Sequence, residues 1–295
     1  MKKLQKFGII LLGLCIAVFI LYEILNYLAK PAPDHPYFSP AGFMVIAHRG
    51  GRSLGPENTL YTYRRAVDLG VDVLEIDVHL TRDNLLAVIH DKTVDRTTNG
   101  SGPVESYNLA DLQKLDAAYR WSAGSGKPFS LRGKGIKIPS LAEVFEAFPQ
   151  MRINIEIKDP KPAAINSLCR SIQGHNMSQK VMVASFSARA LKKFRTICPA
   201  VATSAGSSEA IWFYALQKMH LESVYTPNAQ ALQVPENYGD LQVVNKRFIA
   251  AALARNLRVQ VWTVNDIDSM KHLIKLGVDG IMTDYPQRLI KLSPE

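Results

Sequence analysis

VLEIDV, residues 73–78, alternates apolar side chains with the carboxylates of Glu75 and Asp77. Successive side chains of a β-strand point to opposite faces, so the two carboxylates share one face and the apolar side chains share the other. A second stretch, INIEIK at residues 153–158, repeats the pattern and puts Glu156 and Lys158 on one face. Two such strands, with apolar faces toward helices and charged faces inward, are typical of the interior of a parallel barrel.

The chain from residue 44 onward continues this rhythm of short apolar strands and amphipathic helices. Eight strands are predicted at residues 44–48, 73–78, 153–158, 181–186, 201–205, 231–234, 258–264 and 280–283. Helices are predicted at residues 59–69, 141–148, 163–172, 188–197, 208–219, 246–255, 267–276 and 287–292. Eight such units predict an α/β fold, the (β/α)8 TIM barrel, with a doubly wound open sheet as the alternative.

One long segment interrupts the rhythm after the second strand. Residues 88–90 predict an extra short strand, and the residues that follow it are rich in Gly, Ser and Thr. Long connections in compact domains are usually functional lids or small subdomains. We expect a small insertion at about residues 91–139, whose aromatic side chains Tyr107, Tyr119, Trp121 and Phe129 pack the insertion itself.

The N-terminus carries a 23-residue apolar segment, Phe7 to Ala29, with one charge at Glu23. A membrane-spanning helix needs about 20 apolar residues, so residues 1–30 predict an N-terminal transmembrane anchor, with a cleaved signal peptide as the alternative. Three lysines precede the segment, and the positive-inside rule then puts the domain that follows on the extracytoplasmic side of the membrane. Residues 31–43 hold four prolines and are predicted to be a linker to a domain at residues 44–295.

Composition narrows the possible functions. The 295 residues are 47% hydrophobic, enough for a real core, and carry a net charge of +9. A mild positive field suits phosphate-bearing substrates, whereas no basic run with interleaved aromatic residues indicates nucleic acid. Three cysteines without a C-x-x-C pair argue against a structural zinc site. Cys169 and Cys198 are expected to be free buried thiols, with a disulfide in an oxidising compartment as the alternative.

The acidic strand faces predict a metal site. Two carboxylates near the end of one buried strand repel each other and are costly to bury without a partner. Hard oxygen ligands suit Mg²⁺ or Ca²⁺, so Glu75, Asp77 and Glu156 are predicted to hold one divalent cation.

Two histidines end predicted strands. His48 follows residues 44–47 and His90 follows residues 88–89, and strand carboxyl ends form the active face of a barrel. Two imidazoles beside a cation can act as a general acid and a general base. Arg49 offers a planar fork for phosphate and Lys158 can hold a phosphate oxygen. His79 is a further candidate at the end of its strand.

These motifs together resemble the glycerophosphodiester phosphodiesterase family. The resemblance covers about residues 44–290 in family order and rests on His48-Arg49-Gly50, Pro56-Glu57-Asn58-Thr59, Glu75-x-Asp77, His90-Asp91, Arg96-Thr97-Thr98, Glu156-x-Lys158, residues 261–265 (VWTVN) and residues 277–284 (GVDGIMTD). It implies a TIM barrel with an insertion after the second strand, His48 and His90 as the acid–base pair, and Trp262 as a lining residue of the substrate pocket. The role of Glu57 stays open, and Asn58 is expected to cap the next helix.

The implied activity is hydrolysis of glycerophosphodiesters to sn-glycerol 3-phosphate and an alcohol. The N-terminal anchor makes the sequence similar to the membrane-bound branch of the family, so lysophospholipase D activity on membrane lysolipids is an alternative. A non-catalytic sensor of lipid or phosphate is a third possibility, which the complete set of acidic and histidine residues disfavours. The expected partners are the small-molecule substrate and the membrane.

Overall fold

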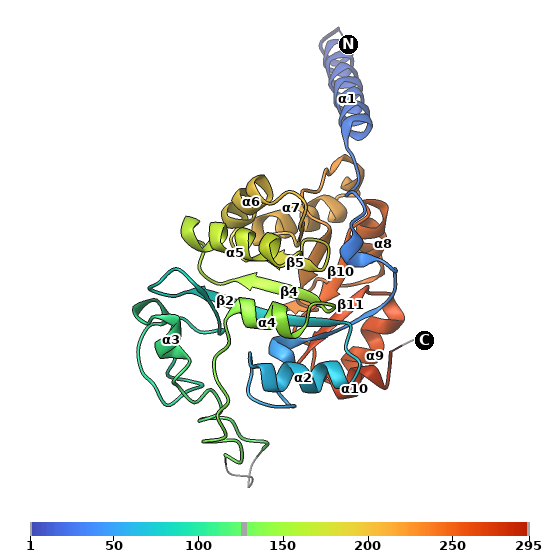
Figure 1. Cartoon of the computed structure of the whole chain (residues 1–295). Coiled ribbons are helices and arrows are strands. Elements are labelled where there is room, and N and C mark those ends of the chain that lie inside the picture. Colours follow the sequence, from blue (N-terminus) through green and yellow to red (C-terminus); the bar gives the residue numbers. More distant parts are fainter. Residues whose placement is uncertain (1, 125–128, 294–295) are drawn as a thin grey trace.

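The computed structural model describes residues 2–124 and 129–293, and consists of one long N-terminal helix that projects from a barrel (Figure 1). The N-terminal helix is α1 (Lys2–Leu28). Within the described residues, eight parallel strands follow one another in the order β6–β5–β4–β2–β1–β11–β10–β7. They are β1 (Met44–Ala47), β2 (Val73–Leu80), β4 (Arg152–Ile157), β5 (Val181–Ala184), β6 (Ala202–Thr203), β7 (Ala231–Val234), β10 (Arg258–Val261) and β11 (Gly280–Thr283).

A parallel bridge between Ser204 and Ala231 joins the two outer strands and closes the ring. The predicted TIM barrel is therefore confirmed, and the open-sheet alternative is wrong. Helices cover its outside: α2 (Leu60–Asp68), α4 (Leu141–Ala147), α5 (Pro162–Gly174), α6 (Ala188–Ile197), α7 (Ser207–Lys218), α8 (Lys246–Ala254), α9 (Ile267–Leu276) and α10 (Pro286–Ile290).

The N-cap residue of helix α2 differs from the predicted one. Thr59 is its N-cap, and the Thr59 hydroxyl accepts a hydrogen bond from the backbone N–H of Thr62. Asn58 precedes it with a φ of 57° and turns its side chain inward, where Nδ2 donates to Asp77 at 2.9 Å. The prediction that Asn58 caps the helix is wrong, because its amide bonds a buried carboxylate instead.

The segment between α1 and the barrel packs against the domain. Residues Pro36–Phe38 form the short 3-10 helix η1, and Tyr37 and Phe38 are buried. Their rings join the interior cluster that contains Met44, the first residue of β1, and Ala231, the first residue of β7. This part of the predicted linker therefore closes the amino-terminal end of the barrel interior.

The insertion after β2 starts with β3 (Leu86–Val88), which pairs antiparallel with β2. It continues through η3 (Val104–Ser106) and α3 (Leu109–Leu112), around a small core of its own with buried Val94 and Leu112. Tyr107 packs on this core. A second excursion, the hairpin of β8 (Asn237–Tyr238) and β9 (Leu241–Gln242), was not predicted.

The two cysteines of the barrel domain form a disulfide. Cys169 lies on α5 and Cys198 caps the end of α6, and their Cα atoms are 5.8 Å apart. The expectation of free thiols is wrong, because the neighbouring helices α5 and α6 bring together two residues separated by 29 positions in sequence. This distance lies in the usual disulfide range.

Helix α1 stands outside the core. Residues Gln5–Leu28 have a mean hydropathy of 2.6 over their most apolar window, and none of that window is buried within the described chain. By its length and composition the helix can therefore cross a membrane, as predicted. Its last turns touch the barrel, since the hydroxyl groups of Tyr22 and Ser223 lie 3.0 Å apart.

Candidate functional site

A cavity of about 670 Å³ opens at the carboxyl ends of the barrel strands. The predicted residues that line it are His48, Arg49, Glu75, His90, Glu156, Lys158 and Trp262. Asp77, the remaining predicted residue, lies just behind this wall, with Lys158 Nζ 3.1 Å from its Oδ1. The fold therefore brings all eight predicted site residues to one place.

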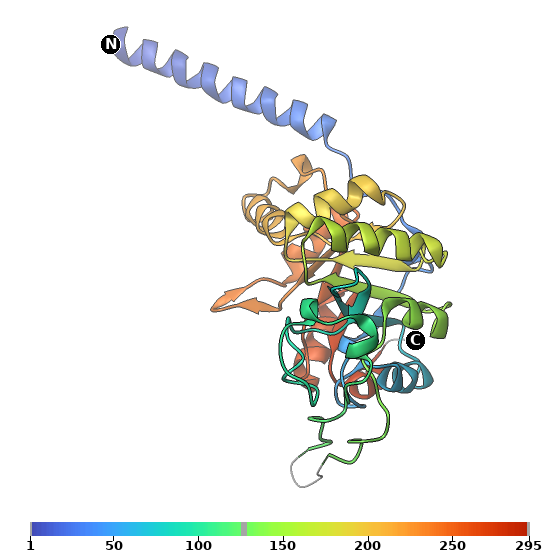
Figure 2. The same ribbon diagram turned by 60° about the vertical axis from the view of Figure 1, so that its left-hand side comes forward.

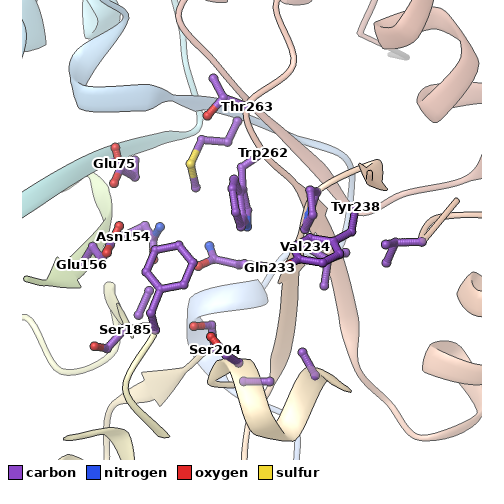
Figure 3. Close-up of a pocket in the computed structure, with 18 of the residues that line it drawn as sticks. Glu75, Asn154, Glu156, Ser185, Ser204, Gln233, Val234, Tyr238, Trp262 and Thr263 are labelled. Carbon is purple, nitrogen blue, oxygen red and sulfur yellow. The ribbon is translucent and has the colours of Figure 1, made fainter. Parts of the chain in front are cut away.

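Strand alternation positions the three carboxylates. Glu75 and Asp77 point inward from β2 and are 2% and 1% exposed. Glu156 comes from β4 and lies opposite Asp77 in the parallel register. One oxygen from each of the three residues lies within 4.8 Å of the others. Figure 3 shows Glu75 and Glu156 facing the same side of the cavity.

The neighbouring side chains do not fully compensate the negative charge of this carboxylate cluster. Burial, with the Asp77 charge adding to it, raises the pKa of Glu75 to about 8. Burial also raises the pKa of Glu156. Among the described residues Asp77 Oδ1 accepts no hydrogen bond, although Lys158 lies within ion-pair distance. Two buried carboxylates and a half-buried one, with an unsatisfied acceptor among them, fit a divalent cation such as Mg²⁺ or Ca²⁺.

His48 is held by Asp284, the residue that follows the last strand, β11. Its Nδ1 lies 2.8 Å from Asp284 Oδ1, and Asn265 Nδ2 donates to the other oxygen of Asp284 at 2.9 Å. Burial alone would lower the pKa of His48, but the hydrogen bond to Asp284 and the charge of Glu75 outweigh it and raise the pKa. With Nδ1 engaged, Nε2 is the nitrogen available to a substrate.

His90 is held by its own neighbour. Its Nδ1 lies 2.6 Å from Asp91 Oδ1, and Arg96 Nε donates to Asp91 Oδ2 at 2.6 Å. Burial lowers the pKa of His90 despite the opposing charge of Asp77 and the hydrogen bond with Asp91. The two imidazoles therefore share one architecture, an aspartate on Nδ1, but their pKa values move in opposite directions.

Glu57 joins the arginines around the site. It accepts hydrogen bonds from Arg49 at 2.9 Å, from Arg52 at 3.0 Å and from Arg96 at 2.6 Å. Burial opposes ionisation, yet these arginines lower the pKa of Glu57 to about 2. Glu57 is therefore ionised, and it fixes the Arg49 guanidinium, whose Nε lies 3.5 Å from Asp77.

The turn after β1 needs unusual backbone angles. Arg49 has a φ of 51°, and its backbone N–H donates to Glu75 Oε2 at 2.7 Å. Gly50 has a φ of 85°, and a Cβ at this position would lie 2.6 Å from the ring of Tyr63. Glycine is thus required for both conformation and space, which explains the His-Arg-Gly sequence.

Several supporting residues received no role from the sequence patterns, although the quoted motifs contain Asp91 and Asp284. Asp284 and Asp91 orient the two histidines, and Asn154 lines the cavity with a buried Oδ1 that has no partner among the described residues. His79 is not among the cavity-lining residues, and its Nε2 lies 3.0 Å from the carbonyl oxygen of His90. An asparagine or aspartate at a strand end was the signal that the sequence offered for these supporting residues. Such a residue does not reveal which side chain it will contact in the fold.

The cavity continues away from the carboxylates along an apolar wall. Trp262 stands between the two parts, with Glu75 and Glu156 on one side and Val234 and Tyr238 on the other (Figure 3). The Phe186 ring packs edge-on against Trp262 at 5.7 Å. The far wall is made by the α7 residues Ala210, Ile211 and Tyr214 and by the hairpin residues Tyr238 and Leu241. We call the two parts the charged half and the apolar half.

Comparisons with known proteins agree with this geometry. The model of the glycerophosphoryl diester phosphodiesterase family matches residues 48–288. A glycerophosphodiester phosphodiesterase of Caldanaerobacter subterraneus subsp. tengcongensis is 35% identical over 258 residues, which cover 84% of this chain and 97% of the relative. Human lysophospholipase D GDPD1 is 26% identical over 269 residues, which cover 83% of this chain and 84% of the relative.

A solved structure is similar over nearly the whole domain. An Oleispira antarctica phosphodiesterase in complex with the product sn-glycerol-3-phosphate has a TM-score of 0.72 and 26% identity, covering 88% of this chain and 99% of that chain. The family expected from the sequence motifs is confirmed by these matches. The chain therefore belongs to the glycerophosphoryl diester phosphodiesterase family and is a phosphodiesterase enzyme.

Proposed function

We propose that the chain hydrolyses glycerophosphodiesters to sn-glycerol 3-phosphate and an alcohol, using a divalent cation and the His48–His90 pair. The observation that carries the proposal is that both imidazoles line one cavity with Glu75, Glu156 and Lys158. The product bound to the Oleispira antarctica phosphodiesterase supports the choice of product.

Glu75, Asp77 and Glu156 would hold the cation, since their oxygens converge and a positive charge would offset the burial that raises the pKa of Glu75. When bound, a divalent cation polarises a phosphoryl oxygen and neutralises charge that develops on it. Mg²⁺ and Ca²⁺ both suit an all-oxygen donor set.

The remaining charged residues would bind phosphate and move protons. Arg49 presents a guanidinium held by Glu57, and Lys158 presents an ammonium between Asp77 and Glu156, so both can stabilise phosphate charge. One histidine accepts a proton from the nucleophile, either water or the glycerol 2-hydroxyl; in the second case a cyclic phosphodiester forms, and water opens it to sn-glycerol 3-phosphate. The other donates a proton to the leaving alkoxide. In both histidines, an aspartate on Nδ1 stabilises the imidazolium.

A second candidate activity is the lysophospholipase D reaction, in which the substrate carries one acyl chain. The apolar half of the cavity favours it, because Phe186, Ile211 and Val234 provide an apolar wall beyond Trp262. The similarity to human lysophospholipase D GDPD1 also supports it.

The location is part of the proposal. Helix α1 would cross the membrane once, and Lys2, Lys3 and Lys6 on its amino-terminal side would keep that end in the cytoplasm. The barrel would then lie on the extracytoplasmic side.

The test compares glycerophosphocholine and lysophosphatidylcholine as substrates of the full chain, with Mg²⁺, with Ca²⁺ and with a chelator. Release of sn-glycerol 3-phosphate from glycerophosphocholine, lost with the chelator, is the expected result. Faster turnover of the lysolipid would favour the second candidate. Full activity in the chelator would contradict the cation, and no turnover of either substrate by a folded, metal-loaded chain would contradict both reactions.

A further inference from the structure

Four large apolar or aromatic side chains near the cavity mouth are exposed to solvent. They are Ile211 and Trp212 on α7, 69% and 56% exposed, and Tyr238 and Leu241 on the β8–β9 hairpin, 76% and 46% exposed. Ile211, Tyr238 and Leu241 line the rim of the apolar half. We call these four residues the docking face. A group of exposed apolar side chains at a binding-site rim usually marks a contact surface.

The docking face continues directly into the end of α1. Trp212 and Leu25 of α1 line the same surface pocket, together with Leu216 and Val224. The backbone N–H of Lys30, just after α1, donates to Thr226 at 3.2 Å. The end of the apolar helix is thereby fixed beside α7. In Figure 2, α1 leaves the top of the barrel and the orange β8–β9 hairpin leaves its flank, and both extend toward the left of the view.

The chemistry of these residues suits a lipid interface. Tryptophan and tyrosine concentrate at the level of the lipid headgroups, where an apolar ring and a polar atom are both satisfied. The two elements carry charges of both signs: Glu209, which is paired with Arg195, and Lys218 on α7, and Asp240 at the hairpin turn. No single sign of charge dominates these two ends, so a zwitterionic surface is sufficient.

We propose that the docking face rests on the bilayer that α1 crosses, so that the apolar half of the cavity opens at the membrane surface. The inference rests on the proposed membrane anchoring. It adds that the barrel is held in one orientation by direct lipid contact, and is not only tethered. A glycerophosphodiester with one acyl chain would then reach the carboxylates from the lipid phase, with its chain along the apolar wall.

Tryptophan fluorescence tests this contact. The full chain is reconstituted in vesicles of phosphatidylcholine with brominated acyl chains, which quench nearby indoles, and in matched vesicles without bromine. The sequence holds three tryptophans, and Trp212→Phe is expected to remove most of the quenchable emission. Trp121→Phe is the matched control and is expected to leave the quenchable emission unchanged. Trp121 lies in the insertion, where its Nε1 donates a hydrogen bond to the backbone carbonyl of Arg52. In the Trp212→Phe background, Tyr238→Trp is expected to restore quenching.

The outcomes separate three ideas. If the protein floats with the vesicles but Trp212→Phe and Trp121→Phe are quenched equally, docking is overturned and the membrane anchor is still supported. Protein that does not float with the vesicles overturns anchoring and docking together. Shielding of Trp212 by a second copy of the chain would appear as unquenched emission with a cross-linked dimer, and also overturns the proposal. Turnover of glycerophosphocholine by the same samples reports on the proposed reaction separately.

Discussion

The charged and apolar halves of the cavity are built in different ways. In the charged half, side chains from β2, β4 and the strand ends are buried and held by partners, as Asp284 holds His48. In the apolar half, the walls come from α7, the β8–β9 hairpin and the segment after β5, and residues such as Phe186 and Tyr238 are largely exposed. The charged half is therefore built on the barrel strands, whereas the apolar half, which we propose selects the substrate, lies largely on peripheral elements.

The largest effect should come from the histidines of the charged half. His48→Ala or His90→Ala is expected to lower turnover about 10²- to 10⁴-fold, because each removes a proton-transfer group. His272→Ala, at an exposed position on α9, is the control and should retain activity. Steady-state kinetics with thermal unfolding of each variant make the measurement. Retention of most activity by either site variant would contradict the acid–base pair.

The carboxylate cluster should make stability depend on pH. The folded pKa of Glu75 is about 8 against an ordinary value of 4.5, so the folded state binds the extra proton between these values. In a chelator, the free energy of unfolding is therefore expected to fall as pH rises from about 4.5 to about 8, by on the order of a few kcal/mol. Urea unfolding at several pH values measures it.

Glu75→Gln should flatten this pH dependence, because the amide does not titrate. Addition of Mg²⁺ or Ca²⁺ should also weaken it, since bound carboxylates are already ionised. An unchanged pH profile in Glu75→Gln would assign the effect to other groups.

Glu57 should show a smaller effect through Arg49. Glu57→Gln removes the charge that holds three arginines, and misplacement of Arg49 is expected to lower kcat/KM by about tenfold to a hundredfold. Binding of sn-glycerol 3-phosphate, measured by calorimetry, should weaken as well. A variant that loses thermal stability but binds this product normally would show that Glu57 has a structural role and does not position Arg49.

The smallest effect is expected in the apolar half. Ile211→Ser removes an apolar surface at the rim, and should lower the ratio of kcat/KM for lysophosphatidylcholine to that for glycerophosphocholine by several-fold. Leu69→Ser, at a partly exposed site beyond α2, is the control. Equal ratios in the two variants would mean that this wall does not contact an acyl chain.

The sequence predicts the charged half much better than the apolar half. Strand alternation depends on local pattern alone, so Glu75, Asp77 and Glu156 could be placed on one face from their spacing. The pairing of His48 with Asp284 joins residues 236 positions apart and depends on which strands become neighbours when the barrel closes. The hairpin, with two residues in each strand, is too short for a periodic signal.

The Cys169–Cys198 disulfide can form only where the barrel matures under oxidising conditions. Cytosolic glutathione and thioredoxin keep thiols reduced, so a barrel completed in the cytosol would leave α5 and α6 unlinked. The bond closes a loop of 29 residues, and its loss would cost about 3–4 kcal/mol in the chain-entropy view. Export across the membrane would let the two thiols oxidise to this disulfide. A recombinant preparation should therefore be directed to an oxidising compartment.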